Sequence, residues 1–113
     1  MRTIRVAVCR LDEVPLGRAK VVLFGNDTGE CAVMYVHHNG EQRLAACGSV
    51  CPHQNASLDG AVVIGSEIVC ARHGFRFDAI SGDCCTLGGY GVPIFSVYAD
   101  GDLVYVSFMD FDE

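Results

Sequence analysis

The chain has 113 residues, of which half are apolar and 19% are charged, and its formal net charge is -6. This length fits a single domain, the apolar share excludes a disordered chain, and the negative charge argues against nucleic acid as a partner. No apolar run reaches the roughly 18 residues that a membrane span needs, so we expect no membrane association.

The first residues carry no apolar core of a secretory signal, because Arg10, Asp12 and Glu13 interrupt that stretch. We therefore expect a cytoplasmic protein in a reducing compartment. The chain has seven cysteines. In such a compartment, Cys together with His indicates a metal site more readily than a disulfide.

Short runs of apolar and β-branched residues, separated by turn residues, predict an all-β, antiparallel protein. The first strands are expected at residues 3–9, 19–24, 31–37 and 42–47, with a turn-rich link at 11–17. Between the third and fourth runs lies Asn39-Gly40, and Asn-Gly is the strongest short hairpin signal. No segment is typical of a long amphipathic helix.

The second half of the chain continues this pattern. Residues 48–60 are loop-like, 61–64 and 67–70 form a tight hairpin, and 74–79 form a short aromatic strand. A Gly-rich loop then leads to a last hairpin of residues 93–98 and 103–108. We expect one domain over residues 1–113. Residues 1–46 and 84–113 would form a β-sandwich or barrel scaffold, and residues 47–83 an inserted hairpin subdomain that carries the metal-ligand candidates.

Two mixed pairs of Cys and His lie in this inserted part, Cys51-Pro52-His53 and Cys70-Ala71-Arg72-His73, with sixteen residues between them. Structural zinc sites usually pair like with like, which disfavours the alternative of a zinc-stabilised binding module. Two loop tips that face each other can instead hold a binuclear cluster, with both thiolates on one iron and both imidazoles on the other. That is the ligand set of a Rieske centre.

The residues around these pairs closely resemble the Rieske-type ferredoxins that serve bacterial oxygenases, over nearly the whole chain. The pattern C-x-H-x16-C-x-x-H-G is highly specific, and weaker flanking motifs accompany it: Leu58-Asp59-Gly60, Phe75-Arg76-Phe77-Asp78, Ser81-Gly82, Pro93-Ile94 and residues 100–106. The resemblance implies a Rieske iron–sulfur fold with a [2Fe-2S] cluster. Its ligands would be Cys51 and Cys70 on the inner iron and His53 and His73 on the outer iron.

The resemblance further implies a soluble one-electron carrier and not an enzyme. It would accept electrons from a flavin-containing, NADH-dependent ferredoxin reductase and pass them to the terminal oxygenase of an aromatic-ring dioxygenase. A carrier that meets both partners through one tip is expected to be a monomer. The alternatives are the ferredoxin of a diiron monooxygenase and the small Rieske-like subunit of a nitrite reductase. Many of those subunits have lost the ligands, whereas all four are present here.

Four positions in the ligand loops predict a low reduction potential. High-potential respiratory Rieske proteins carry a disulfide between the loops, and a Ser and a Tyr after the second His. The matching residues here are Ala56 and Arg72 for the disulfide, and Phe75 and Phe77 for the hydroxyl donors. Fewer hydrogen-bond donors leave the reduced cluster less stabilised, which lowers its potential.

The other five cysteines are assigned simpler roles. Cys84-Cys85, with Gln54, resembles the ferredoxins of toluene-monooxygenase-type systems, whereas His73-Gly74-Phe75 resembles those of dioxygenases, so the partner stays open. A redox disulfide between the adjacent Cys84 and Cys85 would be strained. The remaining three are expected to be small buried hydrophobes or core supports: Cys9, Cys31 and Cys47.

Overall fold

A computed structural model of the protein describes residues 2–23, 29–51, 56–70, 74–85 and 91–110. Within these ranges the chain forms strands and one short 3₁₀ helix. In order they are β1 (Arg2–Arg10), η1 (Leu11–Glu13), β2 (Lys20–Leu23), β3 (Glu30–His38), β4 (Glu41–Gly48), β5 (Val62–Ile64), β6 (Glu67–Val69), β7 (Arg76–Asp78), β8 (Ile94–Asp100) and β9 (Leu103–Asp110). The predicted all-β, antiparallel class is confirmed. None of the described segments forms a helix that is long and apolar enough to cross a membrane.

Residues 11–17 hold the one element that the sequence did not predict. The backbone N–H of Arg10 donates to the Glu13 carboxylate at 2.8 Å. This contact caps one turn of 3₁₀ helix over Leu11–Glu13, where only a link was expected. The N–H of Val14, which donates to the carbonyl of Leu11 at 3.3 Å, closes that turn. By contrast, the Asn39-Gly40 turn forms as predicted, with φ of 54° and 80° at its two central residues.

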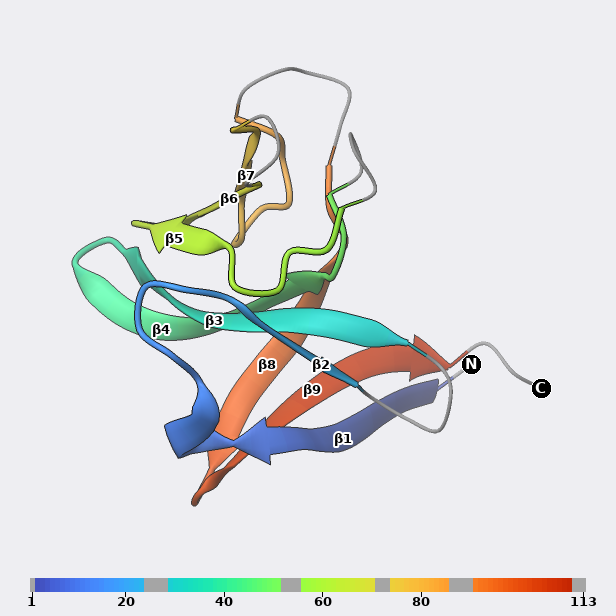
Figure 1. Ribbon diagram of the computed structural model, residues 1–113. Coiled ribbons are helices and arrows are strands. Elements are labelled where there is room, and N and C mark those ends of the chain that lie inside the picture. Colours follow the sequence, from blue (N-terminus) through green and yellow to red (C-terminus); the bar gives the residue numbers. More distant parts are fainter. Residues whose placement is uncertain (1, 24–28, 52–55, 71–73, 86–90, 111–113) are drawn as a thin grey trace.

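The strands form two sheets. The larger has the order β1-β9-β8-β4-β3-β2, and the smaller has the order β5-β6-β7. In Figure 1 the large sheet curls on itself, and the small sheet stands over β3 and β4. Strands β4 and β8 pair only at Ala46 with Phe95 and at Cys47 with Ile94, so the large sheet is narrowly joined there.

Strand β3 separates two hydrophobic cores. Ala32, Met34 and Val36 point into the core between the two sheets, whereas Cys31 and Val33 point into the core inside the curled large sheet. Successive side chains of a strand point to opposite faces. The unbroken apolar run of β3 is therefore explained by burial on both sides.

A strap of three residues, 17–19, ties the small sheet to the scaffold. The N–H of Ala19 donates to the carbonyl of Ala61 at 2.8 Å, and the N–H of Val63 donates to that of Gly17 at 2.9 Å. At the other end of β5, the N–H of His37 donates to the carbonyl of Gly65 at 2.9 Å. The small sheet is thus fixed at both ends of its first strand.

Candidate metal centre

Cys51 begins a loop three residues after the end of β4, and backbone hydrogen bonds close the base of that loop. Its N–H donates to the carbonyl of Ala56 at 2.8 Å. Val50 and Ser57 form an isolated β-bridge just below, and the N–H of Leu58 donates to the carbonyl of Ser49 at 2.8 Å. Cys51 therefore sits at the neck of the loop, and it is fully buried.

Cys70 occupies the same position in a second loop, directly after β6. Its N–H donates to the carbonyl of Phe75 at 2.7 Å, and the N–H of Gly74 donates back to its carbonyl at 3.0 Å. Gly74 has a φ of +73°, which glycine adopts without strain. In both loops the cysteine amide thus bonds the carbonyl five residues further on.

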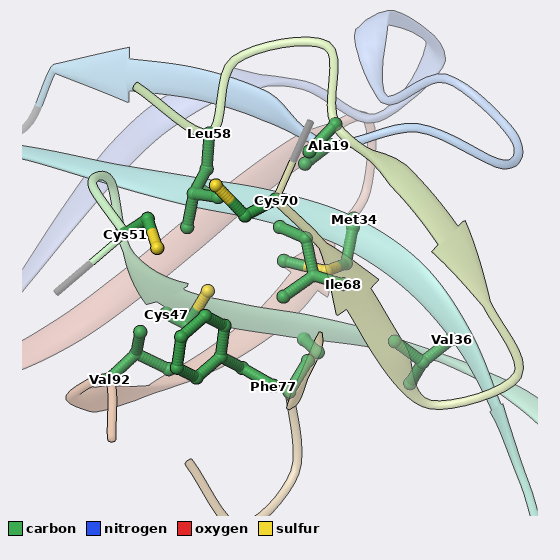
Figure 2. Packing of buried hydrophobic residues seen from close by; sticks show 14 residues of the cluster. Ala19, Met34, Val36, Cys47, Cys51, Leu58, Ile68, Cys70, Phe77 and Val92 are labelled. Carbon is green, nitrogen blue, oxygen red and sulfur yellow. The ribbon is translucent and has the colours of Figure 1, made fainter. Parts of the chain in front are cut away.

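The two thiols share one apolar environment. Cys51 and Cys70 belong to the core between the sheets, together with Leu58, Ile68 and Phe77. Figure 2 shows Cys51 and Cys70 on either side of Leu58, with Phe77 and Val92 close by. Among the described residues, no polar or charged side chain is buried. On the side of the core, the two thiols therefore have apolar surroundings.

This arrangement fits the sulfur half of an iron–sulfur centre, since such clusters are held by cysteine thiolates from separate loops. The other predicted ligands, His53 and His73, lie outside the described residues, as does Arg72. In the ranges that the structure describes, no group of three or more His, Cys, Asp or Glu side chains could hold a metal ion. The described chain thus contributes the two cysteines of the predicted set.

Cys47 lies in the same core but has a different hydrogen-bonding role. Its thiol donates to the carbonyl of Gly48 at 3.4 Å, and burial raises the pKa of Cys47 to about 12. Cys31 is also fully buried, and burial likewise raises its pKa to about 12. The expectation of burial is therefore confirmed for these two, whereas Cys9 is only half-buried.

Cys84 and Cys85 face in opposite directions. Cys84 forms a β-bridge with Phe77 and packs, partly buried, against the core that holds Cys51 and Cys70. Cys85 is exposed, and its N–H donates to the carbonyl of Arg76 at 2.7 Å.

Sequence reasoning missed Cys84, Leu58 and Val92 as neighbours of the predicted ligands. Each belongs to or packs against the core around Cys51 and Cys70. For Leu58, the available signal was that it is a large apolar residue in an otherwise loop-like stretch.

The family model of the Rieske [2Fe-2S] domain matches residues 4–93. The chain belongs to this family. Membership implies a Rieske-type [2Fe-2S] cluster as the cofactor, which confirms the cofactor predicted from the mixed Cys and His pairs. A search of curated proteins found no match.

Solved structures with the same fold cover nearly the whole Rieske chain. The ferredoxin of carbazole 1,9a-dioxygenase from Nocardioides aromaticivorans IC177 is 28% identical, with a TM-score of 0.69 over 94% of this chain and 97% of that one. A ferredoxin of Sphingomonas yanoikuyae B1 is 21% identical, with a TM-score of 0.75 over 94% and 100%. A candidate small subunit of an NADH-dependent nitrite reductase from Mycobacterium tuberculosis is 17% identical, with a TM-score of 0.82 over 97% and 99%.

Proposed function

We propose that this Rieske protein is a one-electron carrier whose [2Fe-2S] cluster is held by Cys51, His53, Cys70 and His73. Cys51 and Cys70 would bind one iron, and His53 and His73 the other. When bound, the cluster takes up and releases one electron at a time. Residues 47–83 would form the cluster-binding subdomain, and residues 1–46 and 84–113 the scaffold that carries it.

The observation that carries this proposal is the matched geometry of the two cysteine loops. Each cysteine is buried at the neck of its loop, and each amide donates to the carbonyl five residues further on, at Ala56 and at Phe75. A cluster whose ligands come from two separate segments needs a loop from each segment. The two loops must meet at one place, as they do here at one apolar core.

The chain's own residues hold the two cysteines in place and surround them with apolar side chains. Leu58, Ile68 and Phe77 surround the cysteines with apolar side chains, which keeps water from the inner side of the site. The backbone hydrogen bonds at the loop necks fix the positions of both cysteines. Such preorganisation keeps structural change between redox states small, which favours rapid electron transfer.

The partners that we propose are a flavin-containing, NADH-dependent reductase as the donor and the terminal oxygenase of an aromatic-ring dioxygenase as the acceptor. The support is the 28% identity to the ferredoxin of carbazole 1,9a-dioxygenase, over nearly the full length of both chains. A monomeric, cytoplasmic carrier is consistent with this role. The ferredoxin of a diiron monooxygenase and the small subunit of a nitrite reductase are the alternatives that the experiment must separate.

The first test is spectroscopic. Protein purified without oxygen should be red-brown and contain two irons and two sulfides per chain. After reduction it should give an electron paramagnetic resonance signal of mixed nitrogen and sulfur ligation. Colourless protein that holds one zinc would end the proposal. His53→Cys should keep a cluster but lower its potential, and an unchanged potential would show that His53 is not a ligand.

The second test identifies the partner. The reduced protein is mixed with a ring-hydroxylating oxygenase, a diiron hydroxylase or a sirohaem nitrite reductase, and reoxidation is followed by stopped-flow absorbance. We expect rapid reoxidation by the first. Faster reoxidation by either of the others would replace the dioxygenase assignment and leave the carrier role intact.

A further inference from the structure

The dipeptide Val92-Pro93 joins the bases of the two cysteine-bearing segments. The carbonyl of Pro93 accepts the N–H of Gly48 at 2.9 Å, three residues before Cys51. The N–H of Val92 donates to the carbonyl of Gly82 at 2.8 Å. Because Val92 and Pro93 are neighbours in the chain, only these two residues separate the hydrogen bond to Gly48 from the hydrogen bond to Gly82.

The contact at Gly48 leaves no room for a side chain. A Cβ atom added at Gly48 would lie 2.9 Å from Cδ and 3.0 Å from Cγ of Pro93. The proline ring is rigid, so it cannot rotate away as a flexible side chain would. Strand β4 therefore meets Pro93 at a distance that only glycine permits.

The contact at Gly82 is closer still. Gly82 has a φ of +86°, and an added Cβ would lie 2.5 Å from the carbonyl oxygen of Val92. The N–H of Gly82 donates to the carbonyl of Asp78 at 2.7 Å, at the end of β7. Strand β7 pairs with β6, which ends one residue before Cys70. A continuous hydrogen-bonded path thus leads from Gly82 to Cys70.

We propose that Gly48, Gly82, Val92 and Pro93 form a clamp that fixes Cys51 relative to Cys70 and so sets the reduction potential of the cluster. These are positioning residues, since they act through the two cysteines. The reason is that the potential of an iron–sulfur cluster depends on the hydrogen bonds and solvent exposure of its sulfurs. A shift of one loop against the other changes both. The inference rests on the proposed cluster ligation.

The first test compares two glycines that both have positive φ. Gly82→Ala brings a methyl group against the Val92 carbonyl, whereas Gly101→Ala, at a φ of +61°, meets nothing within 4 Å. Both variants bear the strain of a left-handed alanine, but only the first displaces the clamp. We expect Gly82→Ala to shift the midpoint potential and the resonance g-values, and Gly101→Ala to leave both unchanged.

The second test is a rescue at the other contact. Gly48→Ala should shift the potential in the cluster-loaded protein. In the apo-protein it should speed hydrogen exchange of the Cys51 amide. The double variant Gly48→Ala with Pro93→Ala lacks the Cδ and Cγ atoms that the new methyl group meets. The midpoint potential and the exchange rate of the Cys51 amide should therefore return toward those of the original protein.

The two tests decide the inference even if Gly82→Ala fails to fold. In that case Gly48→Ala is compared with the double variant that also carries Pro93→Ala. A cluster-loaded Gly48→Ala with unchanged potential, or a double variant without rescue, overturns the clamp. So does an equal shift in Gly82→Ala and Gly101→Ala. Failure of the original protein to hold a cluster at all would instead count against the proposed function.

Discussion

Phe77 and Cys84 lie opposite each other in an isolated β-bridge, and this pairing turns Cys84 toward the core and leaves Cys85 outside. Successive residues of an extended segment point to opposite sides. The adjacent cysteines that the sequence leaves unassigned are therefore chemically different, one a neighbour of the site and the other a surface thiol.

Thiol labelling should follow this division. With a maleimide added to the folded apo-protein, Cys85 should react well before Cys31 and Cys47, which are fully buried. Partial desolvation and the neighbouring Glu67 raise the pKa of Cys85, so its labelling should accelerate toward alkaline pH. Peptide mapping by mass spectrometry gives the order, and Cys85→Ser should remove the fast phase. Faster labelling of Cys31 would contradict the structure.

Replacing either buried loop cysteine should abolish the cluster. Cys51→Ala and Cys70→Ala each remove a thiolate at the neck of a loop, and we expect iron and sulfide content to fall to background in both. Cys85→Ala is the matched control, because its thiol is exposed, and it should keep full cluster content. Visible absorbance and iron analysis check this, and a loaded Cys70→Ala protein would refute the ligand assignment.

The missing hydroxyl at position 77 should keep the potential low. We expect a midpoint below about +100 mV, within the Rieske range of about -150 to +300 mV. Phe77→Tyr places a donor where respiratory relatives carry one. A hydrogen bond contributes about 1 kcal/mol, so the potential should rise by roughly 40 mV, since a tenfold change in a one-electron couple is about 59 mV.

The control for this change is Phe95→Tyr, because Phe95 packs against the other core, inside the large sheet. The midpoint potential of the Phe95→Tyr variant should equal that of the original protein. Protein-film voltammetry measures all three proteins under the same conditions. A rise in both variants would point to a general effect of added hydroxyls and not to the site.

Leu58 should be costly to truncate because it is fully buried between the two cysteines and β3. Leu58→Ala should lower the free energy of unfolding by about 2–5 kcal/mol. Leu16 is 72% exposed, so Leu16→Ala should change the free energy of unfolding by about 0.5 kcal/mol or less. Urea denaturation of the apo-proteins measures both, and equal losses would mean that Leu58 is not part of a packed core.

The buried thiol of Cys31 should make the fold sensitive to alkali. Burial raises the pKa of Cys31 from its ordinary value near 9 to about 12. Between these values the folded state keeps a proton that the unfolded state has lost, so stability falls as pH rises. One such group contributes a slope of about 1.4 kcal/mol per pH unit.

Cys31→Ala should reduce this slope above pH 9 by the contribution of one thiol, whatever its effect on absolute stability. Cys9, which adds to the shift through its charge, is retained in both proteins and serves as the common background. Urea denaturation between pH 8 and 11 tests the difference. Parallel curves for the variant and the original protein would show that Cys31 titrates normally.

The strands of this protein were predictable because their signals are local. Turn residues such as Asn39-Gly40 separate short apolar runs, and each run overlaps an observed strand. The double burial of β3 was also implicit in its unbroken apolar sequence, although which residues face which core needed the second sheet to be placed.

Contacts between distant segments could not be predicted in the same way. The strap bond between Ala19 and Ala61, or the approach of Pro93 to Gly48, depends on how two sheets pack, and no periodicity encodes it. For the site, the spacing of Cys and His indicated the chemistry. The hydrogen bonds from the cysteine amides to the carbonyls of Ala56 and Phe75 could not be predicted, because any residue type can make such backbone bonds.

The pairing of β1 with β9 has a consequence for folding. Strand β1, from Arg2, lies against β9, which ends at Asp110, and this is the most extensive strand pair of the large sheet together with β3 and β4. Among the described strands only β9 pairs with β1, so β1 has no neighbour in the sheet until β9 docks against it. Contacts of such long sequence separation slow folding. Until β9 pairs with it, β1 presents an unpaired backbone edge to which another chain can add.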